Sequence, residues 1–334
     1  MKPRILAVIE RPDDAMAWYR SVLPLLRLKQ IGAIEVDFMM ADNKPKWDLL
    51  VQYDIIFMQR PHEVKYVDLA GIAKLHRLKV WLDFDDPLWS INPESPVHAY
   101  YQQEDTRQAI ERCVNLSDII TVSTPVLAQS VKEYYNKEAV VVLNAADLNG
   151  LQWMAKDLKP APEKPVLAWR GSQTHLEDVM QFKPDMDRID SEIDVAWRMY
   201  GADMYFARKG LKDVTHIGMM DFTLYQQTLR VDKGQVMFVP LADNHFNRCK
   251  SDIAAIEAVV AGMIPVVPSW WELGMATFGM NAEIERVIYM SEDDKRALWR
   301  RFADFVLEHR NLEKENIKRL EVIRSLCPEP SSTH

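Results

Sequence analysis

Short apolar runs alternate with amphipathic segments along the first 143 residues. The apolar runs are typical of buried parallel strands, and the segments whose apolar positions recur every three or four residues are typical of helices. This alternation predicts parallel pairing in a doubly wound α/β sheet. The predicted strands are 4–10, 35–40, 54–59, 80–83, 118–122 and 139–143, and the predicted helices are 18–31, 67–78, 102–115 and 125–135.

A second α/β series follows a proline-rich segment, 149–165, whose composition is typical of a linker between domains. We therefore expect two Rossmann-like, doubly wound parallel-sheet domains that face a cleft. Residues 1–155 form the first and 160–310 the second. A helix at about 311–327 is expected to pack back on the first domain, before a disordered tail at 328–334. The predicted strands of this series are 166–169, 194–200, 214–217 and 286–290, and its predicted helices begin near 175 and span 224–230, 292–310 and 312–326.

The segment 236–269 predicts a binding site for an anion. It combines a buried strand, a polar loop, an amphipathic helix, a glycine turn and a second strand. Arg248, Lys250 and Ser251 stand where the helix is expected to begin, and free backbone N–H groups at a helix start attract anions. Cations are disfavoured there by the helix dipole unless an anion compensates them. These residues suit a diphosphate held without a metal, although solvated surface cations remain the simpler interpretation.

Glu257 lies in the same predicted helix among alanine, isoleucine and valine residues. Burial of an unpaired carboxylate is costly, so this residue is expected either to bind a polar ligand or to form an internal ion pair.

Composition limits the class of protein. The 334 residues are 48% hydrophobic and 27% charged, with a net charge of -8, which argues against a dominant nucleic-acid surface. The first 79 residues nevertheless carry 13 Lys+Arg against 10 Asp+Glu, so this part could face an anionic acceptor. Three scattered cysteines favour a reducing, cytoplasmic compartment. No apolar run is long enough for a signal peptide or a membrane span.

Several ordered motifs resemble those of GT-B-fold glycosyltransferases of the retaining family-4 type, also called glycosyl transferases group 1. Residues 240–269 are similar to that family's Pro-Leu…Asn-Arg-x-Lys-Ser…Glu…Gly-x-Pro-Val-Val segment. Residues 169–176 are similar to its Gly-Ser-x-Thr-His turn, and 142–147 to its Pro-Asn-Gly-Val-Asp motif. Residues 18–25 and 80–86 match recurrent features of one branch.

The resemblance implies a hexosyltransferase that uses a nucleotide-diphosphate sugar, most simply a UDP-sugar, with retention of configuration and with no metal or other cofactor. The second lobe would bind the donor. The first would bind an acceptor, which is a glycan, a lipid-linked sugar or a hydroxylated base in DNA. Oligomeric state is not implied. Glu257 would bind the ribose hydroxyls, Arg248 and Lys250 the diphosphate with help from Ser251, and Gly171 would let the backbone approach the phosphates.

The candidate residues fall into three groups. The donor-binding candidates are Gly171, Ser172, His175, Asn247, Arg248, Lys250, Ser251 and Glu257. The acceptor-binding candidates are Tyr19, Arg20, Arg60, Asp83 and Asp86, and the catalytic candidates are Arg248, Lys250 and Asp85.

Most of these candidates have an alternative role. Asp83 and Asp85 form an Asp-x-Asp at a strand end, which could instead hold Mg²⁺ or Mn²⁺ or cap a helix. His175, Arg20 and Arg60 could be ordinary surface residues, and Trp270 and Trp271 could pack in the core or stack on a base or sugar.

The chain also departs from the family pattern. Cys249 stands where the family has a glutamate, Ser172 replaces an arginine, and residues 11–14 replace a glycine-rich loop. A catalytically inactive nucleotide- or sugar-binding module is therefore the main alternative. A dinucleotide oxidoreductase is disfavoured because neither lobe opens with G-x-G-x-x-G.

Overall fold

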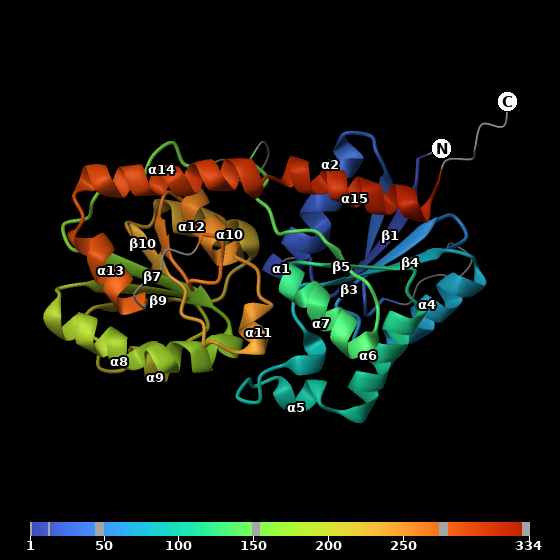
Figure 1. Cartoon of the computed structure of the whole chain (residues 1–334), viewed down its shortest axis with the longest axis horizontal. Coiled ribbons are helices and arrows are strands. Elements are labelled where there is room, and N and C mark those ends of the chain that lie inside the picture. The colour runs from blue at the N-terminus through green and yellow to red at the C-terminus, as the bar shows by residue number, and fades with distance from the viewer. Residues whose placement is uncertain (1, 13, 44–49, 149–153, 274–279, 329–334) are drawn as a thin grey trace.

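The computed structural model of the chain has two α/β lobes that lie side by side (Figure 1). It describes residues 2–12, 14–43, 50–148, 154–273 and 280–328. The start of the predicted linker (149–153) and all but the first residue of the predicted tail (329–334) lie outside the described residues.

The first lobe contains a six-stranded sheet in the order β2-β1-β3-β4-β5-β6, and every pairing is parallel. All six strands were predicted from apolar runs, which follow from burial of both faces of a parallel sheet. The strands are β1 (Arg4–Ile9), β2 (Glu35–Met40), β3 (Ile55–Gln59), β4 (Lys79–Phe84), β5 (Ile119–Val122) and β6 (Val140–Val141).

Helices cover both faces of this sheet, as the alternating pattern predicts. The helix expected at 18–31 consists of α1 (Ala15–Ala17), one π-helical turn (Trp18–Val22) and α2 (Leu23–Gln30). The other helices that the described residues of this lobe form before residue 136 are α4 (Val64–Leu75), a 3-10 turn (Leu88–Ser90), α5 (His98–Tyr101), α6 (Glu104–Leu116) and α7 (Pro125–Tyr135).

The second lobe contains a five-stranded parallel sheet in the order β11-β10-β7-β8-β9. Its strands are β7 (Val166–Gly171), β8 (Ala196–Gly201), β9 (Val214–Ile217), β10 (Val236–Phe238) and β11 (Ile264–Val266). Its helices before residue 262 are a 3-10 turn (Gln173–His175), α8 (Leu176–Glu192), α9 (Tyr205–Arg208), α10 (Phe222–Val231), α11 (His245–Arg248) and α12 (Ile253–Val260). The predicted fold class, two Rossmann-like domains with parallel sheets, is confirmed.

The strand predicted at 286–290 is wrong, because this segment belongs to helix α13 (Met280–Tyr289). Its β-branched residues suggest a strand when they are considered alone. Ile284 and Val287, three positions apart, are both fully buried in the core of the second lobe. That spacing places them on one face of a helix.

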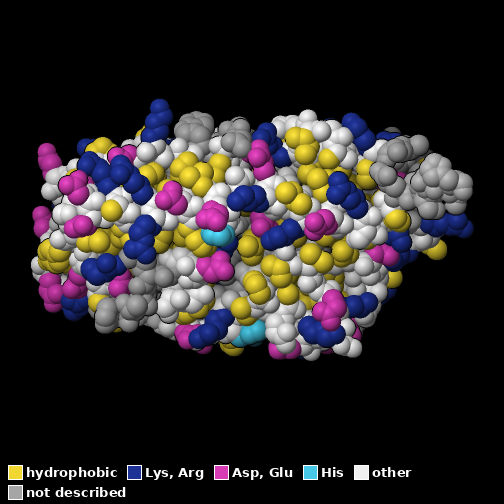
Figure 2. All heavy atoms as spheres, turned by 45° about the horizontal axis from the view of Figure 1, so that its top comes forward, with side chains coloured by type: hydrophobic (Ala, Val, Ile, Leu, Met, Phe, Trp, Pro, Cys, Tyr) yellow, Lys and Arg dark blue, Asp and Glu magenta, His cyan; other side chains and the backbone are white. Residues whose placement is uncertain are grey.

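The last two helices run along one side of both lobes (Figure 1). α14 (Glu292–His309) covers the second lobe, and α15 (Leu312–Leu326) returns to the first. Val322 and Ile323 of α15 are buried in the same core cluster as Ile5 of β1. Positive and negative side chains are interspersed on the face along these helices (Figure 2).

Candidate functional site

A cavity of about 820 Å³ lies between the lobes. Residues that follow the carboxyl ends of β1, β3 and β4 line its first-lobe side, and the ends of β7 and β8 with the start of α12 line the other. Ligands of open parallel sheets bind at such strand ends. The cavity brings together eleven of the predicted residues: Tyr19, Arg20, Arg60, Asp85, Asp86, Gly171, Ser172, His175, Lys250, Ser251 and Glu257.

The end of β7 forms the floor of the second-lobe side. A Cβ atom added to Gly171 would lie 2.6 Å from the ring of Trp169, so a larger residue does not fit without displacing that ring. Glycine therefore keeps the turn close to the cavity wall. Ser172, the next residue, also lines the cavity, and its hydroxyl lies 2.7 Å from that of Thr174.

Glu257 lies at the cavity wall but is only 1% exposed. Its Oε2 atom lies 3.0 Å from Nε of Arg170, and it accepts a hydrogen bond of 3.1 Å from the hydroxyl of Tyr225. Both contacts hold the carboxylate in one orientation at the edge of the cavity.

Arg170 and Tyr225 were missed in the sequence analysis. Arg170 is the last residue but one of β7, directly before Gly171, and a cation at this position of a buried strand was the available signal. The pKa of the Tyr225 hydroxyl is raised by burial and by the charge of Glu257, so this hydroxyl remains a donor.

Lys250 stands in the short loop between α11 and α12, and its side chain is 14% exposed. Its ammonium group lies 3.6 Å from Asp86 Oδ1 of the first lobe and 4.6 Å from the centre of the Phe246 ring. Ser251, the next residue, accepts a hydrogen bond of 2.7 Å from Asn144 of the first lobe. The predicted helix start is displaced, because α12 begins two residues later at Ile253.

Arg248 occupies a different position from Lys250. It is half exposed, pairs with Asp243 and lies over the ring of Trp270. It is not among the described residues that line the cavity. The predicted pair of cations is thus separated, and the part of Arg248 in diphosphate binding stays a prediction.

His175 and Asn247 share one partner. His175 lines the cavity, and its Nδ1 lies 2.9 Å from Asp178 Oδ2. Burial and the charge of Lys250 lower the pKa of His175, against the opposing effect of Asp178, so the imidazole is neutral at pH 7. Asn247 donates a hydrogen bond of 2.6 Å to the other oxygen of Asp178. Asn247 is 2% exposed and is not among the described lining residues, so it supports the loop from behind.

On the first lobe, Arg20 and Asp83 form a buried ion pair. Arg20 donates bonds of 2.9 and 2.7 Å to the two carboxylate oxygens and a bond of 2.6 Å to the carbonyl of Val142. Asp83 also accepts from Thr121, at 2.6 Å. Asp83 is not among the described lining residues, and a role of this pair in acceptor binding stays a prediction. Tyr19, beside Arg20, contacts Phe222 of the second lobe edge to face.

Arg60, Asp85 and Asp86 form a second charged cluster, at the mouth of the first lobe. Arg60 has a positive φ of 47°, which is costly for a residue with a side chain, and it binds both carboxylates. Burial raises the pKa of Asp85 to about 6, although Arg60 opposes this. For Asp86, burial acts in the same direction, but the charges of Lys250 and Arg60 are stronger and lower its pKa.

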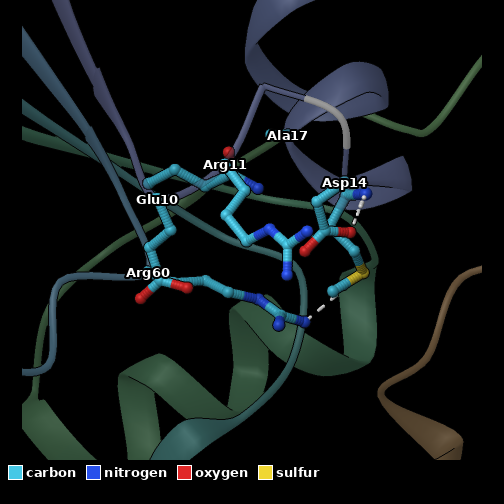
Figure 3. Close-up of a pocket in the computed structure, with 7 residues that line it drawn as sticks. Glu10, Arg11, Asp14, Ala17 and Arg60 are labelled. Atoms are coloured by element: carbon cyan, nitrogen blue, oxygen red, sulfur yellow. Dashed lines mark hydrogen bonds between the residues drawn. The ribbon is translucent and has the colours of Figure 1, made fainter. Parts of the chain in front are cut away.

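A side pocket of about 20 Å³ adjoins the cavity at this cluster. Figure 3 shows Glu10, Arg11, Asp14 and Arg60 around it. Arg11, Asp14 and Arg60 line both spaces, so the side pocket extends the first-lobe half of the cavity.

In the part of the chain that the structure describes, no group of three or more His, Cys, Asp or Glu side chains is arranged to hold a metal ion. The carboxylates of Asp83, Asp85 and Asp86 face arginines instead. Within the same residues, no helix is both long and apolar enough to cross a membrane.

Two Rossmann-like lobes with a cavity between their strand ends define a GT-B-like fold. The chain is similar in structure to the Anabaena protein HepE in complex with UDP and glucose, with a TM-score of 0.63 and 14% identity over 97% of this chain and 100% of that one. It is also similar to an alpha-glucosyltransferase in complex with UDP and a 13-mer DNA containing an HMU base (TM-score 0.56, 12% identity, 97% and 95% covered).

A third similar structure is a putative UDP-N-acetylglucosamine 2-epimerase from Listeria monocytogenes, with a TM-score of 0.52 and 13% identity over 97% of this chain and 96% of that one. No protein-family model matches the chain, and no curated protein matches its sequence. At these identities the similarity establishes the fold, while the activity has to be argued from the site.

Proposed function

We propose that the protein is a glycosyltransferase that moves a sugar from a nucleotide-diphosphate donor, a UDP-sugar, to an acceptor hydroxyl. The observation that carries the proposal is Glu257, a nearly fully buried carboxylate that Arg170 and Tyr225 orient at the cavity wall. Such a carboxylate suits the two hydroxyls of a ribose. UDP in the structures of HepE and of the alpha-glucosyltransferase supports uracil as the base.

Lys250 is the proposed ligand of the diphosphate, and Arg248 would join it after a change of rotamer. In the reaction, the bond between the sugar C1 and the diphosphate oxygen breaks, and a new bond forms from C1 to the acceptor oxygen. The acceptor proton passes to the departing diphosphate on the same face, which gives retention. Lys250 stabilises the charge that develops on the diphosphate, and this needs no protein nucleophile and no metal.

The acceptor is proposed to bind on the first-lobe side, near Arg60, Asp85 and Asp86. A carboxylate there can orient an acceptor hydroxyl. The acceptor is a glycan, a lipid-linked sugar or a hydroxylated base in DNA, and the last is supported by the DNA-bound alpha-glucosyltransferase. Transfer to DNA should weaken steeply with added salt, whereas transfer to a neutral glycan should not.

A screen of UDP-, GDP-, dTDP- and CMP-sugars tests the proposal. The purified protein is expected to release nucleotide from a UDP-sugar and to unfold at a higher temperature in its presence, because a ligand that binds the folded state stabilises it. Both effects should survive EDTA. Failure of every nucleotide-sugar to bind would refute the proposal, and a requirement for metal would favour the Asp83–Asp85 alternative.

A nucleotide- or sugar-binding module without turnover is the second candidate. Cys249, at the position of the usual acid, is fully buried in the core of the first lobe and supplies no carboxylate to a sugar. Stabilisation by UDP-sugars without transfer or hydrolysis would favour this candidate.

A further inference from the structure

The segment 245–251, which carries Lys250, belongs to the second lobe by sequence but is embedded in the first. Phe246 and Cys249 are buried in the same core cluster as Leu88 and Leu127 of the first lobe. Burial of these two side chains makes the contact between the lobes a packed, apolar one. The position of Lys250 is therefore determined by both lobes.

Polar contacts fix the same segment to the first lobe at three further points. Thr124 donates a hydrogen bond of 2.8 Å to the carbonyl of Cys249, and the hydroxyl of Ser130 lies 3.1 Å from Nε2 of His245. Asn144 donates to Ser251 at 2.7 Å. These contacts bracket Lys250 on both sides along the chain and bring its ammonium group to the carboxylate of Asp86.

Asp86 has two cationic neighbours, Arg60 from its own lobe and Lys250 from the other. The side chains of Asp86 and Lys250 are 17% and 14% exposed, so their attraction is weakly screened by water. At 3.6 Å the ammonium group and the carboxylate form an ion pair that lies beyond hydrogen-bond distance. Arg60 remains with Asp86 when Lys250 leaves, so the carboxylate is not left unpaired.

We propose that Asp86 holds the ammonium group of Lys250 while the donor site is empty and that the donor diphosphate competes with Asp86 for this group. This inference rests on the proposed function, because it takes a diphosphate as the ligand of Lys250. Donor binding then frees one oxygen of Asp86 toward the acceptor half of the cavity. The two halves of the cavity are therefore coupled through one ion pair.

The test is calorimetric titration of UDP, with GDP as a second probe, into the wild-type protein and five variants. Asp86→Asn removes the competing charge and is expected to tighten UDP binding about fivefold, the size of a partly exposed ion pair. Asp85→Asn is the matched control. It removes the same charge one residue away, where Arg60 is the neighbour, and should change affinity about twofold or less.

The energetic coupling between Asp86 and Lys250 in UDP binding is measured in the Lys250→Met background. Asp86→Asn is expected to have no effect on UDP affinity there, since the lysine for which the two anions compete is gone. Asp86→Ser repeats the measurement with a different side chain in case Asp86→Asn does not fold, and thermal unfolding checks each variant.

Three results would overturn the inference while leaving the proposed function intact: weaker or unchanged UDP binding by Asp86→Asn, an equal effect of Asp85→Asn, or an undiminished effect in the Lys250→Met background. If the wild-type protein binds neither UDP nor GDP, the proposed function itself fails and this inference fails with it.

Discussion

The two lobes arrange their charged residues in different ways. In the first lobe, each carboxylate at the end of β4 is paired with an arginine of the same lobe, as in the buried pair Arg20–Asp83. In the second lobe, Lys250 pairs with Asp86, a carboxylate of the first lobe. The Arg20–Asp83 pair thus has a structural role, whereas Lys250 is held by a contact that a ligand can replace. Substitutions in the two lobes can show which charged residues stabilise the fold and which bind a ligand.

The largest effect is expected at the buried pair. Arg20→Met leaves Asp83 buried without its bidentate partner and should lower the free energy of unfolding by about 3–5 kcal/mol. Arg208→Met is the control, because Arg208 and its partner Asp203 are 32% and 46% exposed, and removal of this ion pair should lower the free energy of unfolding far less. Denaturation by urea measures both. Equal effects of the two substitutions would contradict a structural role of Arg20.

The second effect concerns catalysis. Lys250→Ala is expected to reduce transfer at least about 100-fold, the loss typical of removing one charge-stabilising donor. Arg248→Ala should cost much less, because this arginine is half exposed, pairs with Asp243 and lies away from the cavity. Steady-state rates with a saturating UDP-sugar make the comparison. Near-normal transfer by Lys250→Ala would refute its role, and an equal loss in Arg248→Ala would show that Arg248 turns inward.

The third effect is a pH dependence from Asp85. Its pKa is raised to about 6. If the ionised form of Asp85 is the active one, turnover should rise about tenfold per pH unit below pH 6 and level off above it.

The contribution of Asp85 to stability should change with pH in the opposite direction. Because the folded state holds this proton more tightly than the unfolded chain, the contribution of Asp85 is fully present below pH 3.8 and is lost as pH rises through about 6. Asp85→Asn should abolish both trends.

The smallest effect is expected at Tyr225. Tyr225→Phe removes one hydrogen bond to the carboxylate of Glu257 while Arg170 remains, so the KM for the donor should rise about fivefold with little change in kcat. Tyr205→Phe, at a half-exposed tyrosine of the same lobe, should leave both constants unchanged. A fall in kcat without a change in KM would contradict a role of Tyr225 in orienting Glu257 for the donor.

The sequence predicted the sheets well and the site in part. Parallel strands buried on both faces leave a clear apolar pattern, and all strands of the first sheet were found from it. α13 was missed because Val287 and Ile288 suit a strand locally, and only packing against the second core makes the segment helical.

Within the site, the sequence could name Arg248 and Lys250 but could not tell them apart. They are two positions apart, and the short helix α11 together with the loop that follows turns one outward and the other into the cavity. Nor could it foresee that Lys250 meets Asp86, since this contact spans both lobes and depends on how they pack. Long-range contacts of this kind have no local pattern.

The return of α15 to the first lobe has a consequence for biosynthesis. Val322, Ile323 and Leu326 complete the core around Ile5 and Trp81, and α15 is tied to α2 by the hydrogen bond from Asn316 to the carbonyl of Pro24. On the ribosome, the sheet of the first lobe emerges long before this helix, and part of its apolar surface stays uncovered while the whole second lobe is made. The first lobe is thus translated before the second but is completed after it.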